Sequence, residues 1–302
     1  MSRQILSVLC TLLTLRQLVT DVNCEKESSL QLLIEGKCSQ MVVKNKIKGL
    51  DCQELWTKFE GVVTDKKLQS TCEMSPNQYD SLVNWLFSFV NKITKPVLWT
   101  KTKNIVDGLC RDLEMCTSVE GTLPGYILDG LDWCDTTLTG NMTYGTNCGC
   151  SRKSKFVYAF WKSVSNAYSK KISGDIQIIL NGSIEKPFDA TRTLGSVELP
   201  NLEYPRIQKT TVYLVHDLAK SDFRHNCSTT TIRDLKRTIE KKNIKFECQE
   251  DPRFITLFQC VKDPQNKRCA LSSGSPSKQG AWNFILRIVL VSVCFYSVNK
   301  KH

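Results

Sequence analysis

The chain has 302 residues, enough for one large domain or two small domains with a substantial hydrophobic core. Hydrophobic residues make up 41% and charged residues 24%, values that exclude wholesale disorder, collagen and a polytopic membrane protein. The formal net charge is +11, but the lysines are scattered rather than gathered into a stripe with interleaved aromatic residues. We therefore expect no nucleic-acid partner.

The counts of cysteine and histidine narrow the class of protein further. The 15 cysteines include no C-x-x-C pair of the kind that binds zinc, and so many thiols pair in an oxidising compartment, which predicts a secreted, disulfide-bonded protein. A serine hydrolase triad needs a histidine base, and a catalytic zinc site usually needs two or three histidines. The three histidines are His216, His225 and His302. We expect His216 to be structural, no metal site, and chemistry that depends on carboxylates.

The first residues have the pattern of a secretory signal peptide. Arg3 precedes an apolar run over residues 5–15, which has the length of a signal-peptide core and is too short to span a bilayer. Cleavage is expected between residues 19 and 24. Residues 1–23 are therefore predicted to be removed.

The C-terminal residues have the order of a glycosylphosphatidylinositol (GPI) anchor signal. Small residues are followed by a polar spacer over 275–280 and a hydrophobic tail over 282–298. The alternative is a single transmembrane helix, but the tail is short and carries Arg287, whereas a spanning helix wants about 20 apolar residues. We expect removal of residues 274–302 and attachment at Ser272, Ser273 or Gly274. The body of the protein would then lie at the cell surface, on the outer leaflet of the plasma membrane, facing the extracellular space. Three glycosylation sequons, at Asn141, Asn181 and Asn226, agree with that location.

In chain order, the first part of the ectodomain, residues 24–170, is mostly helical in pattern. One apolar helical face is formed by Leu82, Trp85, Leu86 and Val90. A second helix is predicted over residues 155–169, with Val157, Phe160, Trp161, Val164 and Tyr168 on one side. A loop-rich stretch, 132–155, lies between the two.

The second part, residues 171–271, has the pattern of an α/β unit. Apolar, β-branched runs predict strands over 175–180 and 210–215, followed by a charged helix over 233–242 and a short strand over 244–248. The fold class predicted for the ectodomain, residues 24–273, is therefore α+β: a helical N-terminal subdomain packed on a small C-terminal α/β subdomain with a short parallel sheet. We expect disulfides to staple it and the active site to lie in the cleft between the subdomains.

Candidate chemical groups occur in three segments. The run VLWTK, residues 97–101, places a tryptophan beside a hydroxyl and a cation, and in residues 120–134 a Pro-Gly turn is flanked by Glu120 and Asp129. The run TLGSVELPNL, residues 193–202, is interpreted as a strand in which Glu198 and Ser196 share one face. An acid in such an apolar stretch costs free energy to bury, so it is either paired or functional.

Several motifs resemble the ADP-ribosyl cyclase / NAD glycohydrolase family of ectoenzymes. They are TLPGY-x-L-x-x-x-x-WC, FWK-x-VS and LNGS…GSVEL-x-NL, in the family's order, and the similarity runs from about residue 38 to residue 269. The resemblance implies that NAD and related pyridine nucleotides bind as substrates, that no separate cofactor is needed, and that Glu198 is the catalytic residue.

The resemblance also assigns roles to other candidate site residues. Cleavage of the nicotinamide–ribose bond develops an oxocarbenium ion, which a carboxylate stabilises or traps, while nicotinamide leaves as a neutral base that needs no strong acid. By resemblance, Trp99 and Trp161 stack on aromatic rings, and Glu120 and Asp129 accept hydrogen bonds from the carboxamide. The groups expected near the pyrophosphate are Thr100, Lys101, Ser165 and Thr193.

The cysteines provide a second comparison with the family. The resemblance implies the disulfides Cys38–Cys52, Cys72–Cys150, Cys134–Cys148, Cys227–Cys248 and Cys260–Cys269. Cys110 and Cys116 are additional, and we predict that they pair with each other across a short loop. This leaves Cys24 unpaired or removed.

One departure from the family pattern bears on the product. Leu194 stands where relatives often have an aromatic residue, and without that shelf water competes better with the freed adenine. Glu120 is, by resemblance, linked to hydrolysis. We therefore expect ADP-ribose and nicotinamide as the main products, with cyclic ADP-ribose minor and base exchange allowed.

Alternatives remain open from the sequence. The protein is either this hydrolase, mainly a cyclase, or a non-catalytic cell-surface receptor or adhesion ectodomain on the same scaffold, and a homodimer is left open. Taken singly, Trp99 could be a core residue, Glu198 a salt-bridged structural acid, and Glu120 or Asp129 a helix cap.

Overall fold

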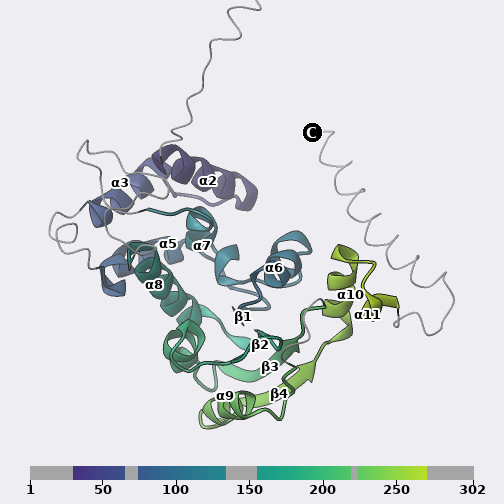
Figure 1. Ribbon diagram of the computed structural model, residues 1–302. Coiled ribbons are helices and arrows are strands. Elements are labelled where there is room, and N and C mark those ends of the chain that lie inside the picture. Colours follow the sequence, from purple (N-terminus) through teal and green to yellow (C-terminus); the bar gives the residue numbers. More distant parts are fainter. Residues whose placement is uncertain (1–29, 65–73, 134–154, 219–223, 271–302) are drawn as a thin grey trace, which may run out of the picture. The chain divides into compact units, whose positions relative to one another are not determined.

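The computed structural model describes residues 30–64, 74–133, 155–218 and 224–270 (Figure 1). The chain divides into two compact units, one formed by residues 1–91 and 120–167 and the other by residues 92–119 and 168–302. Helices and a parallel sheet together confirm the predicted α+β class. Residues 92–119, which the sequence placed in the helical part, belong to the unit that contains the sheet.

The described part of the first unit is helical. Its elements are α2 (Leu30–Asn45), α3 (Cys52–Val63), η1 (Pro76–Tyr79), α5 (Asp80–Ser88), α7 (Leu123–Leu128) and most of α8 (Lys155–Lys171), while η3 (Val119–Gly121) lies at the boundary between the units. The predicted helix over 155–169 is therefore present. The predicted apolar face at 82–90 spans α5 and the residues just after it.

Buried aromatic side chains form the centre of the helical unit. Trp133 makes edge-to-face contacts with Phe59 and Phe160, at centroid distances of 5.3 and 5.4 Å. Its indole N–H donates to the Tyr79 hydroxyl at 2.9 Å, and burial raises the pKa of Tyr79 far above its ordinary value despite this bond. The Cys38–Cys52 disulfide joins α2 to the start of α3, where the Asp51 carboxylate accepts from the first backbone N–H groups of the helix.

The second unit contains a four-stranded parallel sheet in the order β1-β2-β3-β4. The strands are β1 (Val97–Thr100), β2 (Gly174–Asn181), β3 (Ile207–Val215) and β4 (Lys245–Glu250). The last three match the predicted strands. The first was missed, because four residues are too few to display a period.

The remaining elements of this unit are short helices and helical turns. They are α6 (Lys103–Val106), η2 (Asp107–Asp112), η4 (Leu194–Glu198), η5 (Leu199–Asn201), α9 (Thr230–Glu240), α10 (Arg253–Lys262) and α11 (Lys267–Ala270). In one core cluster, Val97, Ile179 and Val215 of the strands pack with residues of α6, η2 and α10. These three elements therefore cover one face of the sheet (Figure 1).

Three disulfides lie in the described part of the second unit. Cys227–Cys248 ties the segment before α9 to β4, Cys260–Cys269 ties α10 to α11, and Cys110–Cys116 closes the short loop after η2. Together with Cys38–Cys52 they match four of the expected pairs. The expected pairs Cys72–Cys150 and Cys134–Cys148 lie outside the described residues, as do Cys24, Asn141, residues 1–23 and the expected anchor site.

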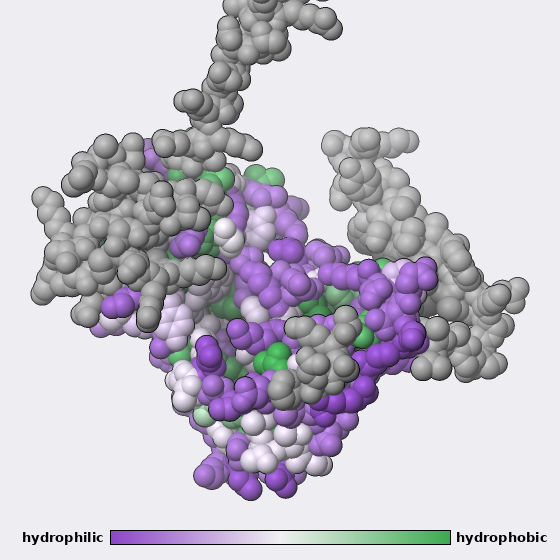
Figure 2. Space-filling view, viewed as in Figure 1, coloured by the Kyte–Doolittle hydropathy of each residue, from purple (hydrophilic) through white to green (hydrophobic). Residues whose placement is uncertain are grey.

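Within the described ranges, no helix is long and apolar enough to cross a membrane. On the face drawn in Figure 2, the described residues are mainly hydrophilic, and hydrophobic residues form small separate patches. Among the large exposed apolar side chains are Phe254, Leu257 and Val261 of α10.

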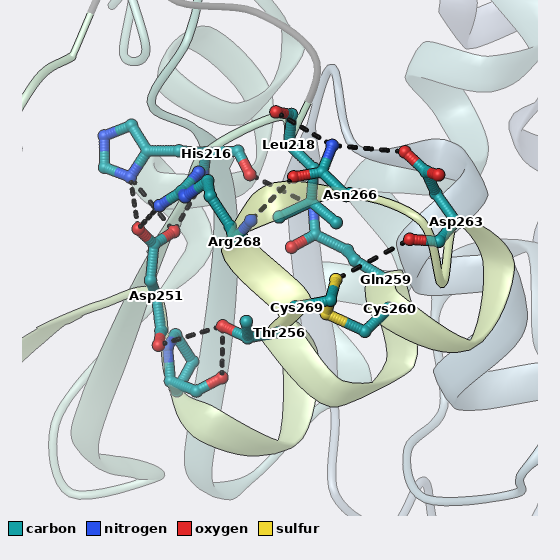
Figure 3. The surroundings of a disulfide bond; sticks show 11 residues. His216, Leu218, Asp251, Thr256, Gln259, Cys260, Asp263, Asn266, Arg268 and Cys269 are labelled. Atoms are coloured by element: carbon teal, nitrogen blue, oxygen red, sulfur yellow. Dashed lines mark hydrogen bonds and ion pairs between the residues drawn. A yellow bond between two sulfur atoms is a disulfide. The ribbon is translucent and has the colours of Figure 1, made fainter. Parts of the chain in front are cut away.

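A partly buried polar network joins the carboxyl ends of β3 and β4 to the C-terminal helices (Figure 3). The Asp251 carboxylate accepts the backbone N–H of His216 at 2.8 Å and lies 3.0 Å from its ring Nδ1, and Arg268 donates to it at 2.8 Å. The other ring nitrogen of His216 lies 2.7 Å from the carbonyl oxygen of His225. His216 thus has the structural position expected of it.

This network sets the protonation of Asp251. Burial alone raises the pKa of the Asp251 carboxyl, but hydrogen bonds from His216 and the charges of His216 and Arg268 outweigh burial and lower it below its ordinary value. A carboxylate with a depressed pKa stabilises the folded state above its unfolded pKa, and this stabilisation is lost as the pH falls through the folded value.

Replacement Asp251→Asn removes that charge while keeping the shape of the side chain. We expect the free energy of unfolding at pH 7 to fall by about 2 kcal/mol, and the gap from the parent to narrow as the pH falls below about 4, where the parent carboxylate also takes up a proton. Denaturant unfolding across this pH range measures the gap. Asp234→Asn, at an exposed ion pair on α9, is the matched control and should change little. A gap that stays constant with pH contradicts the assignment.

Candidate functional site

Glu198 lies in a helical turn, and the predicted strand over residues 193–202 is wrong. Residues 194–198 form the π-helical turn η4, and residues 199–201 continue as the 3-10 turn η5. Glu198 is 6% exposed and Ser196 is exposed, so the two side chains do not share the face that a strand would give them. Pro200 favours this outcome, because its fixed φ and missing N–H suit the first turn of a helix.

A tight turn just before η4 fixes where this segment begins. The Asp189 carboxylate accepts from the Thr191 hydroxyl at 2.7 Å and from its backbone N–H at 2.9 Å, and these hydrogen bonds lower the pKa of Asp189. Gly195 then passes so close to the turn that an added Cβ would lie 2.4 Å from the Ala190 Cα. The close packing of the backbone against Ala190 therefore requires glycine at position 195.

Six of the predicted site residues belong to the sheet-containing unit. They are Trp99, Thr100 and Lys101 at the carboxyl end of β1, and Thr193, Leu194 and Glu198 in and beside η4. β1 and η4 are in contact, so the structure brings the two groups together. Trp99 is half-buried at the edge of a core cluster, a position that leaves part of its ring accessible.

Lys101 marks the end of β1 in a strained conformation. Its φ is +58°, in the left-handed region that non-glycine residues rarely adopt. Its carbonyl oxygen accepts from the Asn181 side chain at 3.2 Å, which links the carboxyl ends of β1 and β2, and its side chain is exposed. Leu194, in contrast, is 3% exposed.

The other four predicted site residues lie in the helical unit. Glu120 is in η3, Asp129 directly follows α7, and Trp161 and Ser165 lie four residues apart on one face of α8. Trp161 is half-buried against Phe160, with ring centroids 5.5 Å apart, and Ser165 is buried. Thr122 is the N-cap residue of α7, and Asp129 is its C-cap residue, whose backbone N–H donates to the carbonyl oxygen of Gly125.

Two polar residues that follow Glu198 in the chain, Asn201 and Arg206, were assigned no role from the sequence. The Asn201 side-chain amide donates to the carbonyl oxygen of Val197 at 2.8 Å, and the Arg206 guanidinium donates to the carbonyl oxygen of Ser169 at 3.1 Å. Asn201 lies within the GSVEL-x-NL run, but no local pattern indicates its contacts. In the ranges that the structure describes, no group of three or more His, Cys, Asp or Glu side chains is placed to hold a metal ion.

Comparison with known proteins assigns the chain to a family. Residues 27–269 match the family model described as ADP-ribosyl cyclase, so the chain belongs to the ADP-ribosyl cyclase family, a family of enzymes. It is 29% identical over 248 residues to the ADP-ribosyl cyclase/cyclic ADP-ribose hydrolase 1 of Rattus norvegicus, covering 80% of this chain and 79% of that protein. The human ADP-ribosyl cyclase/cyclic ADP-ribose hydrolase 2 is 25% identical over 81% of this chain and 76% of its own length.

Solved structures agree with the fold. Porcine CD38 complexed with a covalent intermediate, ribo-F-ribose-5'-phosphate, matches with a TM-score of 0.63 and 29% identity, over 74% of this chain and 96% of that chain. An ADP ribosyl cyclase complexed with N1-cIDPR matches with a TM-score of 0.69 over 80% of this chain and 97% of that chain, at 21% identity.

Replacement Gly195→Ala tests the packing that fixes η4. Because the added Cβ would collide with the backbone of Ala190, either the turn or η4 must shift, and we expect a loss of about 1–3 kcal/mol in the free energy of unfolding. Gly36→Ala, in the exposed middle of α2 with no atom within 4 Å of the added Cβ, should instead stabilise by about 0.5–1 kcal/mol. Equal unfolding midpoints for the two variants would show that η4 is not packed as described.

Proposed function

We propose that this protein is an ectoenzyme that cleaves the nicotinamide–ribose bond of NAD and releases nicotinamide and ADP-ribose. Family membership supports enzymatic use of NAD, and one observation carries the mechanism: a carboxylate, Glu198, is buried in a turn in contact with the strand that bears Trp99. The porcine CD38 structure with a covalent intermediate supports the same kind of chemistry for a relative.

The proposed mechanism depends on the surroundings of Glu198. As the nicotinamide–ribose bond breaks, positive charge develops at the ribose C1′ and its ring oxygen. A carboxylate shielded from water interacts with such a charge far more strongly than an exposed one does. Glu198 stabilises the cation or forms a bond to C1′, and water then completes hydrolysis.

The remaining residues are proposed to bind substrate. Trp99 and Trp161 stack on the aromatic rings of NAD, and Glu120 and Asp129 accept hydrogen bonds from the carboxamide. The pyrophosphate is assigned to Thr100, Lys101, Ser165 and Thr193, with Lys101 acting as a point charge. In this proposal NAD is the substrate, and neither a metal nor a separate cofactor takes part.

The balance of products is proposed to favour hydrolysis. Cyclisation requires the adenine to fold back onto C1′, and Leu194, buried in η4, offers no aromatic shelf to hold it there. Cyclic ADP-ribose is therefore a minor product, and base exchange is the further reaction that the same intermediate allows. A mainly cyclising enzyme and a non-catalytic receptor or adhesion ectodomain are the competing functions.

We propose an extracellular location, with a signal peptide at residues 1–23 and a GPI anchor attached at Ser272, Ser273 or Gly274. Of the two sequons in the described residues, Asn226 is exposed, whereas Asn181 is half-buried and the Ser183 of its sequon is buried. Asn226 is therefore the more accessible acceptor for a glycan.

An NAD incubation with chromatographic separation of products tests the proposal. The parent should give mostly ADP-ribose, and Glu198→Gln, which keeps the shape and loses the charge, should lower turnover about 100-fold or more. Glu203→Gln, at an exposed acid five residues along, is the matched control and should keep parent activity.

Three results would count against this function. Mostly cyclic product from the parent overturns the hydrolytic assignment, and full activity of Glu198→Gln removes Glu198 from the mechanism. No turnover by a correctly disulfide-bonded parent moves the function to binding or adhesion.

A further inference from the structure

We infer that two consecutive residues in the last turn of α8 position the candidate site groups of the sheet-containing unit, namely Trp99 on β1 and Glu198 in η4. Tyr168 holds the strand that carries Trp99, and Ser169, with Asn201 and Arg206, holds the segment that carries Glu198. We call these four residues the α8 anchor. The inference rests on the proposed function, because it explains how that function's catalytic and stacking groups are kept in place.

The first half of the anchor is the Tyr168 hydroxyl. Tyr168 is fully buried, and its oxygen accepts the backbone N–H of Val97 at 3.2 Å and donates to the carbonyl oxygen of Thr117 at 2.7 Å. Val97 is the first residue of β1, two positions before Trp99. One hydroxyl therefore links the start of β1, the segment after η2 and the end of α8.

The second half of the anchor joins α8 to the Glu198 segment. The Ser169 hydroxyl is fully buried and accepts from the Asn201 side-chain amide at 3.1 Å, and the same amide donates to the Val197 carbonyl oxygen at 2.8 Å. Val197 precedes Glu198 directly. Asn201 therefore connects the backbone next to the catalytic carboxylate to a buried hydroxyl on α8.

Arg206 makes a second connection between the end of α8 and the Glu198 segment. Its guanidinium donates to the carbonyl oxygens of Ser169 and Ile172 at the end of α8, and to the carbonyl oxygen of Asn201 in η5. A helix leaves its last carbonyls without helical partners, and a cation is favoured at that end. Arg206 thus satisfies the end of α8 and fastens the Glu198 segment to it in one interaction.

The two halves predict different kinetic effects, because they hold different groups. Displacement of a reacting group by about 1 Å can lower the rate of chemistry 100-fold, whereas displacement of a stacking platform mainly weakens binding. The Asn201 and Arg206 half should therefore control kcat, and the Tyr168 half should control KM.

The test is steady-state NAD cleavage by the purified full-length protein and its variants, with the melting temperature of each recorded. Asn201→Asp keeps the shape but loses the donated N–H groups, and we expect kcat to fall about 10–100-fold with KM within about threefold. Tyr168→Phe should raise KM about fivefold or more and leave kcat within about threefold. Arg206→Gln should resemble Asn201→Asp, and Arg206→Lys should recover part of kcat. Arg237→Gln, at an exposed arginine of α9, is the matched control.

The outcomes separate this inference from the function on which it rests. Folded variants with parent kinetics overturn the anchor. Losses of activity that only follow the fraction of folded protein also overturn it. So does the same combined change, a lower kcat and a higher KM, in the Tyr168 variant and in the Asn201 and Arg206 variants. If neither the parent nor Arg237→Gln cleaves NAD, the proposed function itself fails, and the anchor fails with it.

Discussion

The parallel pairing of β1 with β2 is the constraint on which the candidate site depends. β1 has four residues, lies at the end of the strand order and pairs with β2 alone in the described sheet, so its ladder is short. A parallel ladder of this length is weak by itself. The hydroxyl of Tyr168 at its start, and that of Thr102, which donates to the Ile179 carbonyl oxygen at 3.1 Å just after its end, supplement the pairing. Trp99 is placed between these two supports.

A parallel sheet also brings the ends of its strands to one edge, and this chain uses that edge in two ways. The residues after β1 and β2, Lys101 and Asn181, are joined to each other beside the candidate site. The residues after β3 and β4, His216 and Asp251, form a partly buried network that fastens α10 and α11 to the sheet. The candidate site and the Asp251 network thus occupy neighbouring parts of the same edge.

The sequence predicted those elements whose signal is local. The strands β2 and β3 are runs of β-branched residues, and α8 shows a clear helical period, so all three elements were correctly predicted. The Glu198 segment was assigned wrongly, because Val197 and Leu199 mimic the alternation of a strand over a stretch that Pro200 and the close approach of Gly195 in fact fold into helical turns. A short alternating run carries too little information to decide between these structures.

The candidate site residues were proposed from the resemblance, whereas the residues that hold them in place were not predicted. Asn201 and Arg206 reach α8 residues more than thirty positions earlier in the chain, and contacts of that range leave no local pattern. Tyr168 was expected to lie on an apolar helix face, which it does, but its hydroxyl makes the contact that concerns Trp99. Sequence motifs therefore located the groups proposed for chemistry, and the structure was needed to show what holds them.

The role proposed for Glu198 is tested most directly by a crystal structure of the Glu198→Gln variant with NAD bound. We expect the ribose C1′ to lie beside the side chain at position 198 and the Trp99 ring to stack on the substrate. A complex in which C1′ faces another carboxylate, with position 198 away from the substrate, would contradict it.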